Sequence, residues 1–116
     1  EPTTMIDSKG KEKIYKIIEK LKKEGYTIIC ITNLADEILI ADRILILKNG
    51  KIVEEIKKED LIEKAYVFRK FDIKEPTLLE ILNSLKEKGI ILDMKKFTIN
   101  ELVSKLKGKL KNEECN

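Results

Sequence analysis

The chain has 116 residues, of which 39% are charged and 42% hydrophobic, and its formal net charge at pH 7 is +3. This composition favours a soluble protein with one modest core. The absence of histidine excludes Ser-His-Asp and Cys-His catalysis, HExxH zinc sites and histidine-based pH switches. Cys30 and Cys115 are far apart, so no CxxC redox or zinc motif exists and no metal site is expected. No apolar run reaches the roughly 18–20 residues of a membrane span.

The N-terminal region predicts a loop followed by a helix. Residues 1–8 read as the loop, with Asp7 and Ser8 as helix-capping residues. A helix is expected from Lys9 to Glu24, and Gly25 supplies its left-handed C-terminal stop. Four apolar residues of this helix have the spacing of one buried stripe. They are Ile14, Ile17, Ile18 and Leu21.

A buried strand is expected next. Residues 26–32 form a continuous apolar and β-branched run without polar alternation, which is typical of a strand covered on both faces in a parallel α/β sheet. Asn33 then predicts a helix N-cap, with Asp36 completing a pattern like a capping box. The helix that follows, about Leu34 to Ala41, is short.

The clearest local signal is a β-hairpin. Two strand-like runs, 43–48 and 51–56, flank the dipeptide Asn49-Gly50. This dipeptide favours a type I′ turn, in which both central residues take positive φ.

The remaining chain is expected to be mostly helical. Residues 58–64 predict a polar helix, and residues 65–76 a connector with one short strand. A helix begins at Thr77 and ends at Gly89. Its apolar side carries Leu78, Leu82 and Leu85.

A last helix follows a capping box. Thr98 and Glu101 form the box, and Phe97 with Leu102 has the spacing of a hydrophobic staple. Residues 108–116 are expected to fray. Residues 84–111 carry eight lysines against three acidic residues, a charge excess that could meet an anionic partner, although a solvated lysine face is the simpler interpretation.

Phosphate-binding loops are missing from the sequence. The glycines are too far apart to write GxGxxG or GxxxxGK[ST], so the chain has no phosphate-cradling loop of its own. They are Gly10, Gly25, Gly50, Gly89 and Gly108.

A succession of short motifs carries a family resemblance over residues 1–56. The motifs are Glu1-Pro2-Thr3-Thr4, Ile6-Asp7, Ile31-Thr32-Asn33, Asp36-Glu37, Ala41-Asp42-Arg43 and the hairpin Leu47–Ile52. Together, at these spacings, they resemble the C-terminal half of an ATP-binding-cassette (ABC) ATPase domain. The resemblance implies an α/β fold: the part of a P-loop NTPase core that follows the Walker B strand, with its switch strand and β-hairpin.

Residues 57–107 resemble the C-terminal extension of energy-coupling-factor and cobalt-type importer ATPases. The similarity lies in Pro76-Thr77, in the leucine-rich helix that ends at Gly89, and in the capping-box run Thr98–Leu102. The expected organisation is therefore an ATPase part, a helix with a connector, a small mostly helical extension and a tail. Their ranges are 1–56, 57–76, 77–107 and 108–116.

The resemblance implies roles for three residues. Glu1 matches the catalytic glutamate that orients the attacking water, and an exposed chain-terminal glutamate is the alternative. Asp7 matches the D-loop acid, and a plain helix cap is the alternative. Asn33 stands where the family has its switch histidine; an amide can donate a hydrogen bond but cannot carry a positive charge. This departure puts efficient hydrolysis in doubt, and the sequence does not say whether it is natural or engineered.

The chain begins without an initiator methionine and is expected to be a piece of a longer protein. The resemblance implies that this protein binds ATP and Mg²⁺, pairs with a second ATPase subunit and drives a membrane coupling or permease subunit from the cytoplasmic face, serving vitamin or metal uptake. The chain alone is expected neither to bind nor to hydrolyse ATP, and to self-associate. The alternative is a stand-alone, non-enzymatic interaction or regulatory module with lysine-rich C-terminal helices; the 5% aromatic content speaks against nucleic-acid binding.

Overall fold

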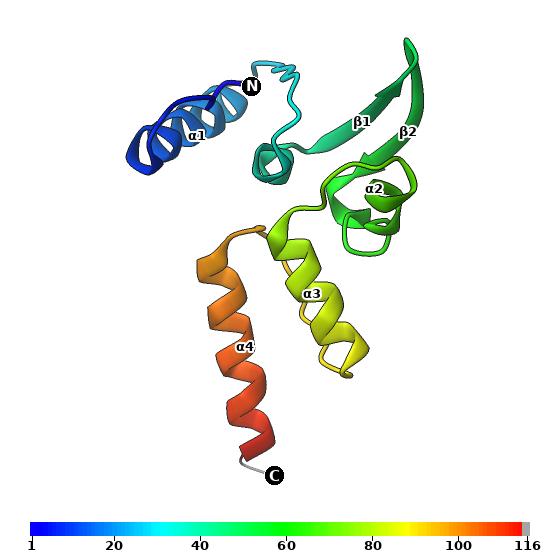
Figure 1. Cartoon of the computed structure of the whole chain (residues 1–116). Helices are drawn as coiled ribbons and strands as arrows, with labels where there is room; N and C mark the ends of the chain where they lie inside the picture. The colour runs from blue at the N-terminus through cyan, green and yellow to red at the C-terminus, as the bar shows by residue number, and fades with distance from the viewer. Residues whose placement is uncertain (115–116) are drawn as a thin grey trace.

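The computed structural model describes residues 1–114 as a mixed α/β chain of helices and one antiparallel β-hairpin (Figure 1). Short 3₁₀ helices, labelled η, connect the longer elements. In chain order the elements are α1 (Ser8–Lys23), η1 (Ala35–Ile40), β1 (Arg43–Lys48), β2 (Lys51–Lys57), η2 (Lys58–Asp60), α2 (Tyr66–Lys70), α3 (Thr77–Glu87) and α4 (Ile99–Glu114).

The molecule is extended, with dimensions of 51 × 32 × 28 Å. Its radius of gyration is 15.8 Å, whereas a compact domain of this length has about 13 Å. Its accessible surface is 8960 Å², against about 6,500 Å² for a folded monomer of this mass. The chain therefore leaves much more surface exposed than a self-contained domain would.

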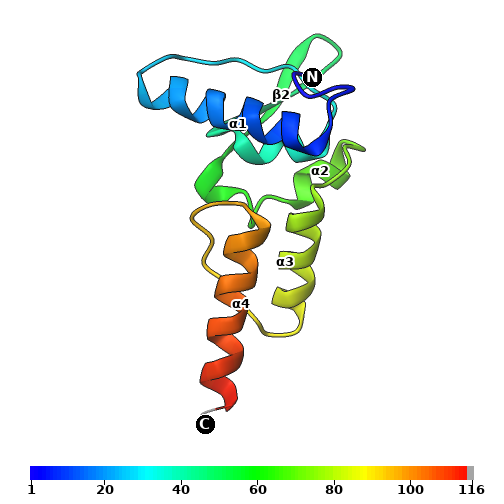
Figure 2. The ribbon, with the colours of Figure 1, turned by 90° about the vertical axis from the view of Figure 1, so that its left-hand side faces the viewer.

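Helix α1 forms where the sequence predicts it but is not buried. Asp7 caps it by accepting a hydrogen bond from the Gly10 main-chain N–H at 2.8 Å, and Gly25 has the expected positive φ of 92°. The expectation of a buried stripe is wrong, because no residue of α1 is buried and Ile17 is 57% exposed. Figure 2 shows the reason: α1 lies across the top of the molecule, away from α3 and α4.

The predicted strand at residues 26–32 does not form. The segment is extended but belongs to no sheet, and Ile29 and Ile31 are 87% and 85% exposed. A strand needs a neighbour to pair its main-chain groups, and in the described chain the only sheet is the hairpin. The apolar composition of this run indicated a buried strand, but no partner strand lies beside it.

The hairpin is confirmed. Strands β1 and β2 pair antiparallel, and both turn residues have positive φ: 51° at Asn49 and 74° at Gly50. The register shifts between Ile46 and Leu47, which marks a β-bulge. Only one face of the hairpin is covered, because Ile46 and Ile56 are buried while the apolar residues of the other face are exposed. Those exposed residues are Leu45, Leu47, Ile52 and Val53.

The core lies between the hairpin and the C-terminal helices. Phe68, at its centre, is fully buried on α2. Residues 65–76 were expected to be a connector with a strand, and this is wrong, since they contain α2. The polar helix expected at 58–64 is also wrong, because only the single turn η2 forms there. The core side chains are Ile46, Ile56, Leu61, Ala65, Val67, Phe68, Leu78, Leu79, Leu82, Leu92, Met94, Phe97 and Leu102.

The last two helices confirm the predicted boundaries at three of their four ends. Helix α3 begins at Thr77, and Gly89 follows its C-cap with a φ of 83°. Thr98 caps α4 by accepting from the Glu101 main-chain N–H at 3.2 Å. The Glu101 carboxylate accepts hydrogen bonds from the main-chain N–H groups of Lys95 and Lys96. Both bonds lower the pKa of Glu101, and the bond from Lys95 has the larger effect. The expected fraying from residue 108 is wrong as far as residue 114, and residues 115 and 116 lie outside the described part.

Replacing Phe68 should cost more stability than any surface change on the same helix. Phe68→Ala removes a fully buried ring and should lower the free energy of unfolding by about 3–5 kcal/mol. Tyr66→Ala is the matched control, because Tyr66 is 64% exposed on the same helix and should change stability by only about 0.5 kcal/mol. Urea denaturation followed by circular dichroism measures both, and equal losses would contradict this core.

Candidate functional site

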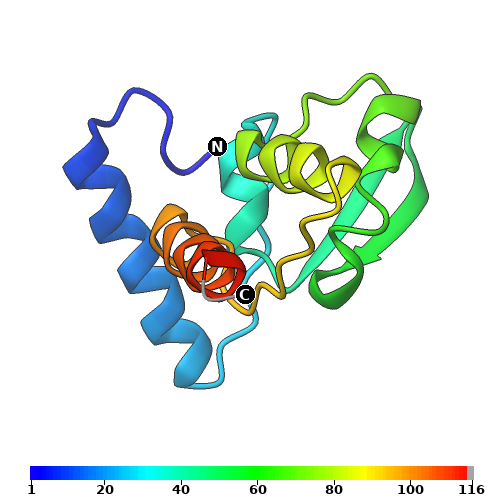
Figure 3. The same cartoon turned by 90° about the horizontal axis from the view of Figure 1, so that it is seen from below.

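Two segments far apart in the sequence lie side by side at the N-terminus. The N-terminus lies next to η1 (Figure 3), and Glu1 and Thr3 contact Ile31 and Glu37. The main-chain nitrogen of Glu1 donates to the carbonyl oxygen of Ile31. Further along, the main-chain N–H of Thr3 donates to Glu37 Oε1 at 2.9 Å, and the Thr3 hydroxyl donates to the same oxygen at 2.5 Å. These contacts gather the motif residues of the two segments at one place.

Glu37 is the buried acid of this site. Glu37 is only 4% exposed, and its hydrogen-bond partner Thr3 is 1% exposed. One carboxylate oxygen, Oε1, receives both hydrogen bonds from Thr3, while Oε2 is buried without a hydrogen-bond partner in the described chain. A buried carboxylate with one free oxygen is uncommon, and such a group calls for a role.

The charge state of Glu37 follows from its surroundings. Burial acts to raise the pKa of Glu37, but the hydroxyls of Thr3 and Thr32, the main-chain N–H of Thr3 and the positive N-terminus outweigh it and hold the pKa below its ordinary value. Tyr15 on α1 faces the same cluster. Burial raises the pKa of its phenol, Thr3 opposes this, and the negative charges of Glu37 and Asp36 raise it further.

The three residues singled out by sequence lie on the surface around Glu37. The Glu1 carboxylate is exposed and accepts from the Thr4 hydroxyl at 3.3 Å. Asp7 is exposed and caps α1. Asn33 is exposed and does not cap the next helix, as had been expected, because Leu34 occupies the N-cap position without a side-chain bond. Instead, the Thr32 hydroxyl accepts from the Leu34 main-chain N–H at 2.9 Å.

Sequence reasoning noted Glu37 only as part of a motif and missed its burial. No local spacing indicates this burial, because Leu34, three residues before Glu37, is exposed and lies outside η1. The burial comes from Thr3, which is distant in the sequence.

One ion pair attaches α1 to the rest of the chain. Lys22 Nζ lies 2.8 Å from Asp42 Oδ1 and 3.5 Å from the carbonyl oxygen of Ile40. The Asp42 side chain is 69% exposed, so solvent screens the pair and it stabilises only weakly. Together with the Thr3–Glu37 bonds, it fixes where α1 lies.

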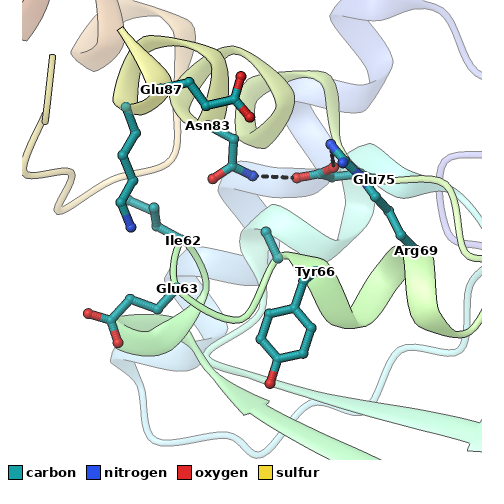
Figure 4. Close-up of a pocket in the computed structure, with 9 residues that line it drawn as sticks. Ile62, Glu63, Tyr66, Arg69, Glu75, Asn83 and Glu87 are labelled. Atoms are coloured by element: carbon teal, nitrogen blue, oxygen red, sulfur yellow. Dashed lines mark hydrogen bonds and ion pairs between the residues drawn. The ribbon is translucent and has the colours of Figure 1, made fainter. Parts of the chain in front are cut away.

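A hollow away from Glu37 lies between α2 and α3 (Figure 4). Its volume is about 320 Å³, and Glu75 is its buried acid. Both Glu75 oxygens are paired, one with the Asn83 amide at 2.9 Å and the other with the Arg69 guanidinium at 3.4 Å. Because these contacts tie α2 to α3 and leave Glu75 no free oxygen, they are structural. The lining residues are Ile62, Glu63, Ala65, Tyr66, Arg69, Glu75, Asn83, Lys86 and Glu87.

Residues 1–114 contain neither a cluster of metal-ligating side chains nor a membrane-spanning helix. No group of three or more histidine, cysteine, aspartate or glutamate side chains is placed to hold a metal ion. No helix in that range has both the length and the apolar character needed to cross a bilayer.

The Glu37 carboxylate should stabilise the fold in a pH-dependent way. Its folded pKa lies below the ordinary value of 4.5, so its contribution is present above pH 4.5 and is lost as the pH falls through the folded pKa. Glu37→Gln should therefore lose about 1–3 kcal/mol at neutral pH and much less in acid. Asp36→Asn removes an exposed charge on the same helix and serves as control. Urea denaturation at both pH values tests this, and a pH-independent loss in the Gln variant would contradict it.

No protein-family model matches the chain, but individual proteins do. The energy-coupling factor transporter ATP-binding protein EcfA1 of Caldanaerobacter subterraneus subsp. tengcongensis is 33% identical over 104 residues, covering 89% of this chain and 38% of that protein. EcfA1 of Ligilactobacillus salivarius is 34% identical (89% and 37%), and EcfA1 of Clostridioides difficile is 30% identical (91% and 39%). The chain is thus homologous to the energy-coupling factor transporter ATP-binding proteins and spans a little more than a third of their length.

Proposed function

We propose that this chain is the C-terminal part of an ABC-type ATP-binding subunit that couples ATP binding and hydrolysis to membrane transport. The observation that supports the proposal is that Glu1 contacts Ile31 and Thr3 contacts Glu37, so that Glu1, proposed as the catalytic glutamate, and Asn33, proposed as the switch residue, belong to segments that meet. Similarity over about 90% of the chain to energy-coupling factor ATP-binding proteins supports it.

In this proposal Glu1 acts on water. Its carboxylate is exposed, as a group that must meet an attacking water and a γ-phosphate should be. Asn33, also exposed, would donate its amide hydrogen bond to the γ-phosphate but supplies no positive charge. Asp7 would contact the second ATPase subunit across the nucleotide while it caps α1. ATP and Mg²⁺ belong to the longer subunit, since the Walker A loop that holds the phosphates is not in this sequence.

The proposed organisation follows the sequence. Residues 1–56 belong to the P-loop NTPase core, 57–76 are a helix and connector that include α2, 77–107 form the helical extension, and 108–116 are a tail whose residues 108–114 continue α4. The subunit works at the cytoplasmic face of the membrane, paired with a second ATPase subunit and bound to a membrane coupling or permease subunit. Vitamin or metal-ion uptake is the proposed transport class.

The competing proposal, a stand-alone interaction module, has weaker support. It needs a self-sufficient fold, whereas the chain exposes about a third more surface than a compact monomer of its mass. The coding sequence upstream of Glu1 separates the two proposals. A Walker A loop upstream and an aspartate directly before Glu1 are expected; a start codon at that point would overturn the ATPase proposal.

The 116-residue chain alone should not bind ATP. Positioning and charge neutralisation of the phosphates supply most of phosphoryl-transfer catalysis, and the sequence contains no loop that does this. Titration with a fluorescent ATP analogue and Mg²⁺ should show no saturable binding tighter than about 1 mM. Saturable binding by the purified chain, removed by excess unlabelled ATP, would contradict the prediction.

The chain should also self-associate through residues 26–32. The main chain of this segment is in no sheet, and its Ile29 and Ile31 side chains are exposed, so the segment offers an edge to which another strand can pair. Sedimentation should show a dimer or larger species, which Ile29→Lys with Ile31→Lys shifts to monomer. Ile91→Lys is the control, because Ile91 is 64% exposed in a different region. A monodisperse wild-type monomer would contradict this edge.

A further inference from the structure

The two segments of the site are joined on both sides of Asn33. Before it, the Glu1 main-chain nitrogen donates to the carbonyl oxygen of Ile31. After it, Thr3 donates twice to one oxygen of Glu37. A chain held at two points flanking position 33 cannot slide or turn relative to that position without breaking one of the joints.

The two joints differ in strength because they differ in burial. The contact at Glu1 is exposed and competes with water. The contact at Glu37 is buried, and it combines a charged acceptor with two donors. Removing Thr3 would take away both hydrogen bonds that Oε1 of the buried Glu37 carboxylate accepts, which is strongly unfavourable. The Thr3–Glu37 joint therefore keeps the segments together.

We propose that Glu37 is a positioning residue that fixes the Glu1–Thr4 segment against the segment carrying Asn33, so that side chains 1 and 33 keep one relative placement. The roles of Glu1 and Asn33 rest on the proposed function, but the joint does not. Glu37 is buried behind Thr3 and acts through Glu1. Placement matters because a shift of about 1 Å in a reacting group can cost about 100-fold in rate.

The response of the joint to pH depends on Glu37 itself, and the titratable side chains near it are Tyr15 of α1 and the neighbouring Asp36 of η1. The amino group of Glu1 also acts on Glu37 in this chain, and a peptide bond replaces it in a longer subunit. The hydroxyl and main-chain N–H of Thr3 bond most strongly to the ionised carboxylate. The joint therefore loosens when Glu37 is protonated, whereas an uncharged glutamine at this position makes it independent of acid.

A spin label tests the joint directly. Cys30 is exposed and lies next to Ile31, so a nitroxide on Cys30, in a Cys115→Ser background, should broaden the main-chain NMR signals of Thr3, Thr4 and Met5. Glu37→Leu should abolish this broadening at neutral pH, and Glu37→Gln should weaken it and remove its pH dependence. Asp36→Asn should keep both the broadening and its loss in acid, as in the wild type.

Broadening that persists unchanged in Glu37→Leu would overturn the proposal. If this variant loses its circular dichroism signal, Thr3→Val replaces it, since valine removes one donor and keeps the fold of the main chain. Thr3→Val should weaken the broadening, and a wild-type signal would equally overturn the proposal.

Hydrolysis by the longer subunit separates positioning from a structural role. Glu37→Leu should lower kcat by about tenfold or more while KM for ATP stays unchanged. A changed KM with unchanged kcat would contradict positioning. Glu1→Gln reports on the proposed function alone: if it leaves hydrolysis intact, that function fails, whereas the spin-label result still decides the joint.

Discussion

One constraint governs the structure. An extended apolar segment is buried in a sheet only when a neighbouring strand forms hydrogen bonds with its main chain. Residues 26–34 have no such neighbour in the described chain, so they lie on the surface despite their composition. Every buried apolar side chain of the core lies between residues 46 and 102. The first third of the chain reaches this core through the partly buried Ile38 and Leu39. Residues 1–37 are otherwise held by polar contacts, which are Thr3–Glu37, Lys22–Asp42 and the main-chain bond from Glu1 to Ile31.

This division makes the candidate site the less stable part of the molecule. Local stability follows burial and contact density, and α1 contains no buried residue. Among the polar contacts only the Thr3–Glu37 pair is buried, so it decides how residues 1–4 are placed. Because one buried carboxylate holds residues 1–4, their placement depends on whether that carboxylate is ionised. The placement of a segment packed in an apolar core would not depend on a charge in this way.

Local signals in the sequence predicted local structure well. The hairpin, the Asp7 cap, the glycine stops and the start of α3 each depend on residues within one turn of each other, and all are confirmed. Three predictions were wrong: the strand at 26–32, the N-cap at Asn33 and the connector at 65–76. A strand depends on a partner, and α2 forms because Val67 and Phe68 pack into the core, which no local spacing reports. Glu37 was missed because its burial comes from Thr3, 34 positions away.

The same missing partner explains the surface and the position of the site. The chain spans a little more than a third of its relatives, and two of the three most exposed large apolar side chains in its described part, Ile29 and Ile31, lie on the extended segment that leads into Asn33. A strand placed beside residues 26–32 would cover Ile29 or Ile31 and would continue into Glu1, whose main-chain nitrogen already bonds to Ile31. Under the proposed function, the edge that makes the chain prone to associate is therefore the one that a longer subunit uses to complete its sheet and to bring nucleotide to Glu1 and Asn33.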